Sequence, residues 1–180
     1  PDPLLVGDRW RTMWLERLQA EPLLAIPWLE HPHRDAYWKH GSVNEDIGAI
    51  QAAVLAVGGW NDAYTNAVPR LVSTLKSPAK GIIGPWAHKY PHFAVPEPRI
   101  GFLQEALRWW DRHLKGIDTG VDKDPAFRTY IMDPRRPGAS VTHIGGRWVA
   151  DDAWPADRVE QRRLHLNAEG LSPTPGRSGK

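Results

Sequence analysis

The chain has 180 residues, and its 23 Lys and Arg nearly balance its 21 Asp and Glu, which leaves a formal net charge of +2. This length corresponds to one domain, or to one domain and part of a second. The near balance of charge argues against a nucleic-acid partner, no apolar run is long enough to span a membrane, and the absence of Cys excludes disulfides, cysteine nucleophiles and thiolate metal sites.

The amino-terminal part of the chain is predicted to be helical. In residues 8–20 apolar side chains recur at helical spacing, and Asp8 is the expected N-cap. Prolines interrupt residues 23–41, which predicts short helices joined by proline turns. We assign residues 1–48 to part of a helical cap.

The next segment is predicted to fold as strand, helix, strand, helix. Continuous apolar runs near 52–58 and 80–84 are typical of strands buried on both faces, as in a parallel sheet. Apolar periodicity predicts helices over 64–75 and 100–114. The second helix has an apolar stripe that we expect to face the core, made of Ile100, Leu103, Leu107, Trp110 and Leu114.

Strand-like stretches without helices follow at residues 127–132, 147–149 and 163–166, and the chain ends in a polar tail. We therefore predict an α/β protein in two parts. Residues 49–120 are assigned to one edge of an α/β sheet, because strands and helices alternate there. Residues 121–180 are assigned to the start of an all-β domain.

Two polar clusters directly follow the two predicted strands. Gly58-Gly59-Trp60-Asn61-Asp62 ends in an acid, and Gly84-Pro85-Trp86-Ala87-His88 ends in a histidine. Catalytic groups gather at the carboxyl ends of strands in open α/β sheets, and an acid followed by a histidine is the order that completes a nucleophile–His–Asp triad. On spacing alone, a simple Asn-Asp turn and a solvated loop histidine are the commoner alternatives.

The full amino-acid sequences of these segments are more specific than the spacing of their acid and histidine. GGWNDAYTNAVPRL, KGIIGPWAHKYPHF and IGFLQEALRWWDRHLKGIDTG resemble the CocE/NonD hydrolases of the X-Pro dipeptidyl-peptidase (S15) superfamily. The resemblance implies an α/β-hydrolase with a helical cap, followed by a β jelly roll. Residues 49–120 would then be the carboxyl-terminal part of the α/β-hydrolase core, and residues 121–180 the start of the jelly roll. It implies a serine hydrolase of esters or amides, of the acyl esterase, α-amino-acid ester hydrolase or X-Pro dipeptidyl-peptidase type, with Asp62 as triad acid and His88 as triad base.

The same resemblance bears on cofactors and partners. It implies no cofactor, and a small-molecule or peptide ester or amide as substrate. It leaves open whether the protein is a homo-oligomer. The residue after the acid, often Gly in this family, is Ala63 here, and we expect that difference to matter little.

The chain departs from the family in its nucleophile. The family carries a serine in a G-x-S-x-G elbow before the cap, and none of the six serines here has that setting: Ser42, Ser73, Ser77, Ser140, Ser172 and Ser178. We therefore expect a carboxyl-terminal fragment that supplies acid and histidine but neither nucleophile nor oxyanion hole, and that is inactive alone. The alternative is a non-catalytic, Trp-rich module that binds a ligand.

Two tryptophans lie within three residues of a proposed catalytic group. Trp60 and Trp86 are candidate substrate-binding residues in the wall of an acyl pocket, where rigid aromatic rings suit an apolar ligand. Packing beneath the sheet is an equally good interpretation of both.

A second cluster of potential ligands lies in the predicted cap, namely His31, His33, Asp35 and His40. Such residues can bind zinc, but the intervening prolines spread them apart, so we predict no metal site. The absence of Cys fits a reducing compartment, and we expect the protein to be cytoplasmic.

Overall fold

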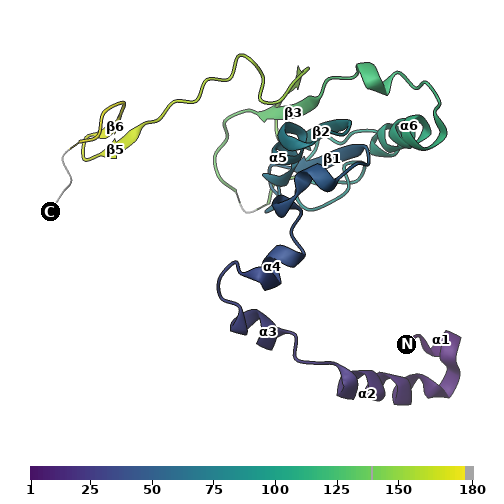
Figure 1. Ribbon diagram of the computed structural model, residues 1–180. Helices are drawn as coiled ribbons and strands as arrows, with labels where there is room; N and C mark the ends of the chain where they lie inside the picture. The colour runs from purple at the N-terminus through teal and green to yellow at the C-terminus, as the bar shows by residue number, and fades with distance from the viewer. Residues whose placement is uncertain (139, 177–180) are drawn as a thin grey trace. The chain divides into compact units, whose positions relative to one another are not determined.

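The computed structural model describes residues 1–138 and 140–176 (Figure 1). The chain divides into two units, Pro1–Asp46 and Ile47–Lys180, which are described separately. Ser178, one of the six serines considered above, lies outside the described residues. Among the described residues, no helix has both the length and the apolar character needed to cross a membrane.

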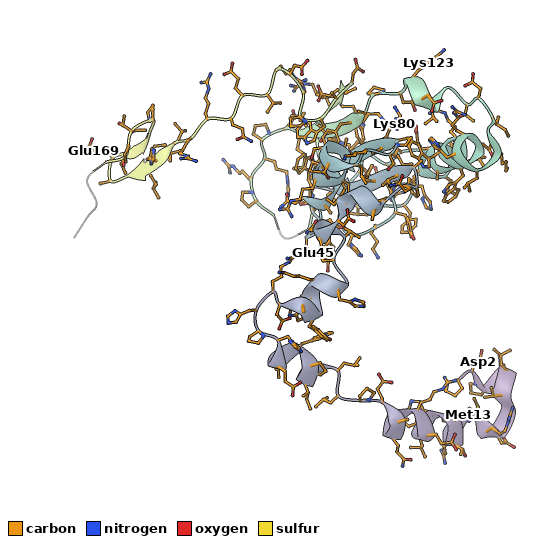
Figure 2. All side chains as sticks on the ribbon, in the orientation of Figure 1. Asp2, Met13, Glu45, Lys80, Lys123 and Glu169 are labelled. Atoms are coloured by element: carbon orange, nitrogen blue, oxygen red, sulfur yellow. The ribbon has the colours of Figure 1, made fainter. Side chains whose placement is uncertain are left out.

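The first unit consists of short helices, as predicted. They are α1 (Pro3–Val6), the 3-10 turn η1 (Gly7–Arg9), α2 (Trp10–Ala20), α3 (Ala25–Glu30), α4 (Ala36–His40) and the 3-10 turn η2 (Val43–Glu45). None of these helices contains a buried residue, and Figure 2 shows their side chains projecting outward.

The prediction of Asp8 as an N-cap is wrong. Asp8 lies inside η1, and the residue before α2, Arg9, already has helical backbone angles. An N-cap side chain needs an extended backbone to reach the free N–H groups, so no cap forms at that point. Asp2 caps a different helix, α1, because its Oδ1 accepts a hydrogen bond from the N–H of Leu4 at 2.9 Å.

The second unit contains a four-stranded sheet in the order β1-β2-β3-β4. The strands are β1 (Val54–Gly59), β2 (Ala79–Gly84), β3 (Phe127–Met132) and β4 (Gly146–Asp151). β2 is parallel to both β1 and β3, and β4 is antiparallel to β3. Gly59 pairs with Gly84, so β1 and β2 end side by side at the same edge.

Both faces of the sheet carry a core. On one face α5 (Ala67–Thr74) packs Val68 against Ala56, Ile83 and Phe127. On the other face Ile82 packs with Trp86 and Ala94. Neighbouring strand residues point to opposite faces, which is why Ile82 and Ile83 belong to different clusters. A 3-10 turn, η3 (Ile47–Ala49), precedes β1, and another, η4 (Val121–Lys123), precedes β3.

Helix α6 (Phe102–Lys115) has the predicted extent and ends at Gly116, which adopts the left-handed conformation with φ +71°. The prediction that its apolar stripe faces the core is wrong. Four of the five stripe residues are 55–78 % exposed: Leu103, Leu107, Trp110 and Leu114. The buried residues of the helix are Ala106 and Trp109.

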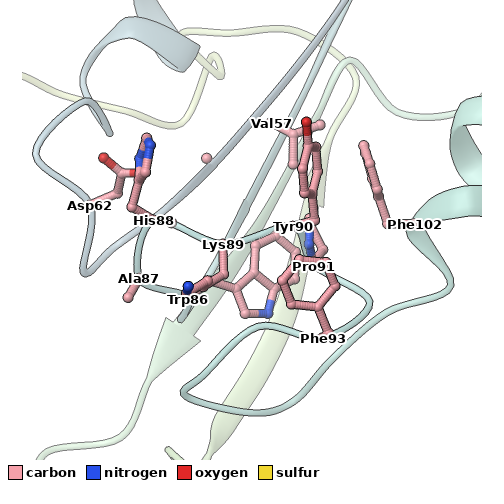
Figure 3. Close-up of a pocket in the computed structure, with 12 residues that line it drawn as sticks. Val57, Asp62, Trp86, Ala87, His88, Lys89, Tyr90, Pro91, Phe93 and Phe102 are labelled. Atoms are coloured by element: carbon pink, nitrogen blue, oxygen red, sulfur yellow. The ribbon is translucent and has the colours of Figure 1, made fainter. Parts of the chain in front are cut away.

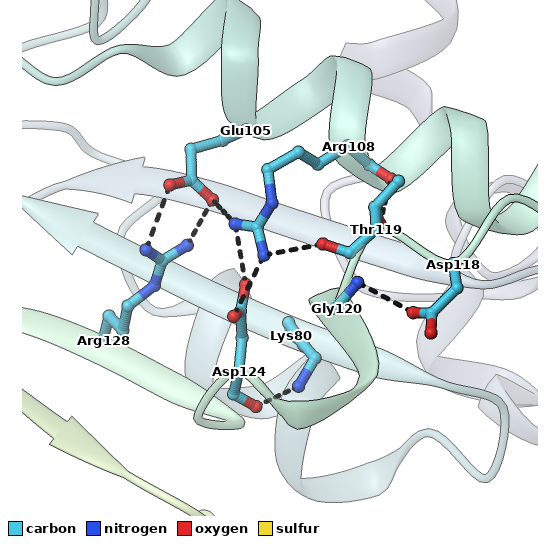
Figure 4. Close-up of polar contacts among 8 residues, drawn as sticks. All are labelled: Lys80, Glu105, Arg108, Asp118, Thr119, Gly120, Asp124 and Arg128. Atoms are coloured by element: carbon cyan, nitrogen blue, oxygen red, sulfur yellow. Dashed lines mark hydrogen bonds and ion pairs between the residues drawn. The ribbon is translucent and has the colours of Figure 1, made fainter.

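Ion pairs explain this orientation of α6 (Figure 4). Glu105 accepts a hydrogen bond from Arg128 on β3 at 2.8 Å, and Arg108 pairs with Asp124 at 3.1 Å. A hydrophobicity pattern assigns Glu105 and Arg108 to the solvent, yet these side chains turn toward the sheet. The helix is therefore rotated away from the position that its apolar period predicts.

β3 begins at Phe127, within residues 121–180, which the sequence assigns to the start of an all-β domain. β3 pairs with β2 in the same sheet, and the buried Phe127 joins the core with Ile83. A short apolar strand has the same pattern at the edge of a mixed sheet as in an all-β domain, so the sequence does not separate the two cases. β5 (His165–Asn167) and β6 (Gly170–Ser172) form a hairpin of their own, and the jelly-roll domain stays a prediction.

Candidate active site

The loops that leave β1 and β2 run against each other. The N–H of Trp60 donates to the carbonyl of Gly84 at 2.9 Å, and the N–H of Asn61 donates to the carbonyl of Trp86 at 3.0 Å. Backbone pairing thus continues beyond the strand ends. The approach is close enough that a Cβ on Gly59 would lie 2.0 Å from the carbonyl oxygen of Trp86.

This arrangement brings Asp62 and His88 together (Figure 3). Oδ2 of Asp62 lies 2.8 Å from Nδ1 of His88, and Oδ1 accepts a hydrogen bond from the N–H of Tyr64 at 2.9 Å. The Asp62 side chain is 13 % exposed, whereas that of His88 is 82 % exposed. A proton on Nδ1, bound to the carboxylate, leaves Nε2 as the basic nitrogen on the open side of the ring.

The surroundings of Asp62 favour its ionised form. The hydrogen bond from the Tyr64 N–H, followed by that from His88, lowers the pKa of this carboxyl below its ordinary value of 3.8, against the smaller effect of desolvation. Asp62 is therefore a carboxylate at neutral pH, as an acid that orients a histidine must be.

This lowered pKa predicts a pH dependence of stability. A folded-state pKa below the unfolded value stabilises the protein at pH values above about 4, and the contribution is lost as pH falls through the folded pKa. We expect the wild type to be more stable than Asp62→Asn near pH 6, with the difference shrinking on acidification to about pH 2. Urea unfolding across that range measures it. Asp157→Asn, at an exposed position, is the control for loss of one surface charge, and a gap between wild type and Asp62→Asn that does not shrink contradicts the prediction.

A cavity of about 500 Å³ opens beside the pair (Figure 3). Asp62 and His88 line it, and Tyr90, Phe93 and Phe102 provide aromatic walls. The rings of Tyr90 and Phe102 are stacked, with centroids 6.0 Å apart. Sequence reasoning missed these three residues, because the first two lie in a loop without periodicity. Their only signal was the nearness of Tyr90 to His88 along the chain.

The two predicted pocket tryptophans differ in position. Trp86 lines the cavity and is also buried in the core against Ile82, and its part in an acyl pocket stays a prediction. Trp60 does not line the cavity, because its indole N–H donates to the carbonyl of Tyr130 at 2.7 Å and so ties the loop to β3.

The other predicted clusters are placed as follows. His31 and Asp35 form a side-chain contact of 2.6 Å between Nδ1 and Oδ2. Within residues 1–138 and 140–176, no group of three or more His, Cys, Asp or Glu is arranged to hold a metal ion. None of the residues that line the cavity is a serine.

Comparisons with known proteins find similarity to hydrolases and esterases. The family model described as X-Pro dipeptidyl-peptidase (S15 family) matches residues 5–90. Two proteins with a provisional serine esterase name, from Mycobacterium bovis and Mycobacterium tuberculosis, are each 29% identical over 145 residues, which is 77% of this chain and 20% of theirs. The cocaine esterase of Rhodococcus sp. is 25% identical over 175 residues, which is 87% of this chain and 29% of that protein.

Solved structures show the same fold. Two crystal structures of a CocE/NonD family hydrolase from Staphylococcus aureus superpose with TM-scores of 0.63 and 0.60 at 18% sequence identity. They cover 82% and 86% of this chain, and 25% and 26% of the hydrolase chains. The chain thus spans about a fifth of the length of the two mycobacterial relatives, 29% of the cocaine esterase and about a quarter of these structures.

Proposed function

We propose that this chain, which belongs to the CocE/NonD hydrolases of the X-Pro dipeptidyl-peptidase (S15) superfamily, supplies the acid and the histidine of a Ser-His-Asp triad. The observation that carries the proposal is the 2.8 Å contact between Asp62 and His88 at the carboxyl edge of parallel strands. The proposed reaction is hydrolysis of an ester or an amide. The names of the relatives, serine esterase and cocaine esterase, favour esters.

The proposed mechanism follows from the geometry of the pair. A serine hydroxyl attacks the substrate carbonyl carbon, and its proton passes to Nε2 of His88. The same nitrogen then protonates the leaving alcohol or amine, which leaves an acyl-enzyme. Water then attacks the acyl-enzyme carbonyl and gives a proton to Nε2 of His88. The bond between the acyl carbon and the serine oxygen breaks, His88 returns the proton to that oxygen, and the carboxylic acid leaves. Asp62 keeps the proton on Nδ1 and stabilises the imidazolium in both steps.

Residues 1–180 alone are expected to lack esterase activity, because they contain no G-x-S-x-G serine for His88 to activate. The measurement is hydrolysis of p-nitrophenyl acetate by the purified chain, with His88→Ala as the control for background reaction at an exposed imidazole. Equal rates in the two proteins support the proposal. Faster hydrolysis that disappears in His88→Ala would show that a nucleophile within this chain is sufficient.

The nucleotide sequence upstream of Pro1 tests the triad itself. An in-frame G-x-S-x-G, about the length of a cap before Pro1, supports the proposed function. If the reading frame holds no such serine, the proposal fails, and a Trp-rich binding module without catalysis becomes the better account.

A further inference from the structure

Asn61 lies between Trp60 and Asp62 in the loop after β1, and the sequence assigns it no role beyond that of a possible Asn-Asp turn. In the structure its Nδ2 donates a hydrogen bond to the carbonyl of Pro85 at 2.6 Å. Its backbone N–H donates to the carbonyl of Trp86 at 3.0 Å. One residue of the Asp62 loop thus binds two consecutive carbonyls of the loop that carries His88.

We propose that Asn61 is a positioning residue, which holds the two loops at the separation that the Asp62–His88 hydrogen bond requires. The catalytic relevance of this role rests on the proposed function. Asn61 does not touch the cavity, and it acts on the pair only through the backbone of the neighbouring loop.

Each loop is held by hydrogen bonds of its own, but few hydrogen bonds join the two loops to each other. Asp62 is held within its own loop, because its N–H donates to Gly59 and its Oδ1 accepts from Tyr64. On the other side, the N–H of Ala87 donates to the carbonyl of Val95 at 2.9 Å. The pairing of β1 with β2 ends at Gly59, before either catalytic residue. Beyond it, the N–H of Trp60 still donates to Gly84, the last residue of β2, and the two bonds of Asn61 reach the loop that follows β2.

The surroundings of Pro85 and His88 explain why the hydrogen bond from the Asn61 side chain affects the position of His88. Pro85 is fully buried, so its carbonyl group has little access to water as a substitute partner. The His88 ring is 82 % exposed and has little packing to hold it in place. Its distance from Asp62 therefore depends on where its backbone is held. The side chain of Asn61 binds that backbone three residues upstream, at Pro85, and its N–H binds it two residues upstream, at Trp86.

Two substitutions at this position separate the hydrogen bond from the shape of the side chain. Asn61→Ala removes the whole amide. Asn61→Asp keeps the shape, but places a carboxylate oxygen against the Pro85 carbonyl, where it repels rather than donates. Asn66→Ala is the matched control, because Asn66 is exposed and makes no side-chain capping bond at the start of α5.

The experiment measures the ring nitrogens of His88 by ¹⁵N NMR in residues 1–180. In the wild type we expect the proton on Nδ1, bound to Asp62, with Asp62→Asn as the reference for a broken pair. In Asn61→Ala and Asn61→Asp, the ratio of paired to unpaired His88 is expected to fall about fivefold, the scale of one lost hydrogen bond. Asn66→Ala is expected to match the wild type. Urea unfolding confirms that each variant is folded.

The experiment distinguishes failure of the inference about Asn61 from failure of the proposed function. If both Asn61 variants are folded and keep the wild-type ratio, Asn61 has at most a structural role and the inference is overturned. A loss of stability without a change in that ratio overturns it in the same way. If the wild type and Asp62→Asn have the same ring nitrogen shifts, no Asp62–His88 bond exists in solution. That result removes the proposed function itself.

Discussion

Replacement of His88 by alanine is expected to lower kcat for a p-nitrophenyl ester by about 10⁴-fold or more. The protein assayed must contain both residues 1–180 and an upstream segment with a G-x-S-x-G serine. In the proposed mechanism Nε2 of His88 takes the serine proton and gives it to the leaving group, so its loss would disable both steps. KM is expected to change little, because the exposed ring contributes little to substrate binding. Separate kcat and KM values from steady-state kinetics measure this.

Asp62→Asn is expected to have an effect of similar size, about 10⁴-fold in kcat, because an amide favours the wrong tautomer of the histidine. The chain offers a matched control in His31 and Asp35, a second His–Asp contact, 2.6 Å long, that does not lie at a strand end. His31→Ala and Asp35→Asn are expected to leave kcat unchanged. A His88→Ala protein that keeps a tenth of the wild-type kcat would contradict the triad assignment.

Gly59→Ala is expected to destabilise the second unit by about 3 kcal/mol or more. The added Cβ would lie 2.0 Å from the Trp86 carbonyl oxygen and 2.6 Å from its carbonyl carbon. These are backbone atoms, so no rotamer change relieves the clash, and the two loops must separate. Separation also breaks the bond from the Asn61 N–H to Trp86. Urea unfolding at neutral pH gives the free-energy difference.

The control for this prediction is Gly138→Ala. The nearest atom to its new Cβ is Cγ2 of Val141, at 4.0 Å, which is an ordinary contact. We expect the free energy of unfolding to change by less than about 0.5 kcal/mol. If Gly59→Ala proves as mild as Gly138→Ala, the loops are not packed as closely in solution as the structure shows.

The sequence predicted the features that depend on local pattern. The apolar runs that became β1 and β2 are continuous and end in glycine, and their ends fall within two residues of the predicted ones at the edge where the loops meet. The proximity of Asp62 and His88 followed from topology, because parallel neighbours bring their carboxyl ends together. No side-chain detail was needed for that step.

Features that depend on which surfaces meet were not predictable. The orientation of α6 is set by the pairs of Glu105 with Arg128 and Arg108 with Asp124, and each partner is distant in sequence or lies in a loop. The pairing of β3 with β2 depends on a partner strand and not on the composition of β3. The aromatic walls of the cavity come from a loop and a helix start that only the fold brings together.

The acid and the histidine are separated by only 26 positions, and a single crossover, β1–α5–β2, joins them. The entropy of closing a loop grows with its length, so a short crossover brings the pair together at low entropic cost. The sequence separation between the two residues in contact is thus short. The contact also does not depend on where Pro1–Asp46 or the β5–β6 hairpin lies. Any rearrangement of those parts that leaves the crossover intact also leaves the Asp–His pair intact.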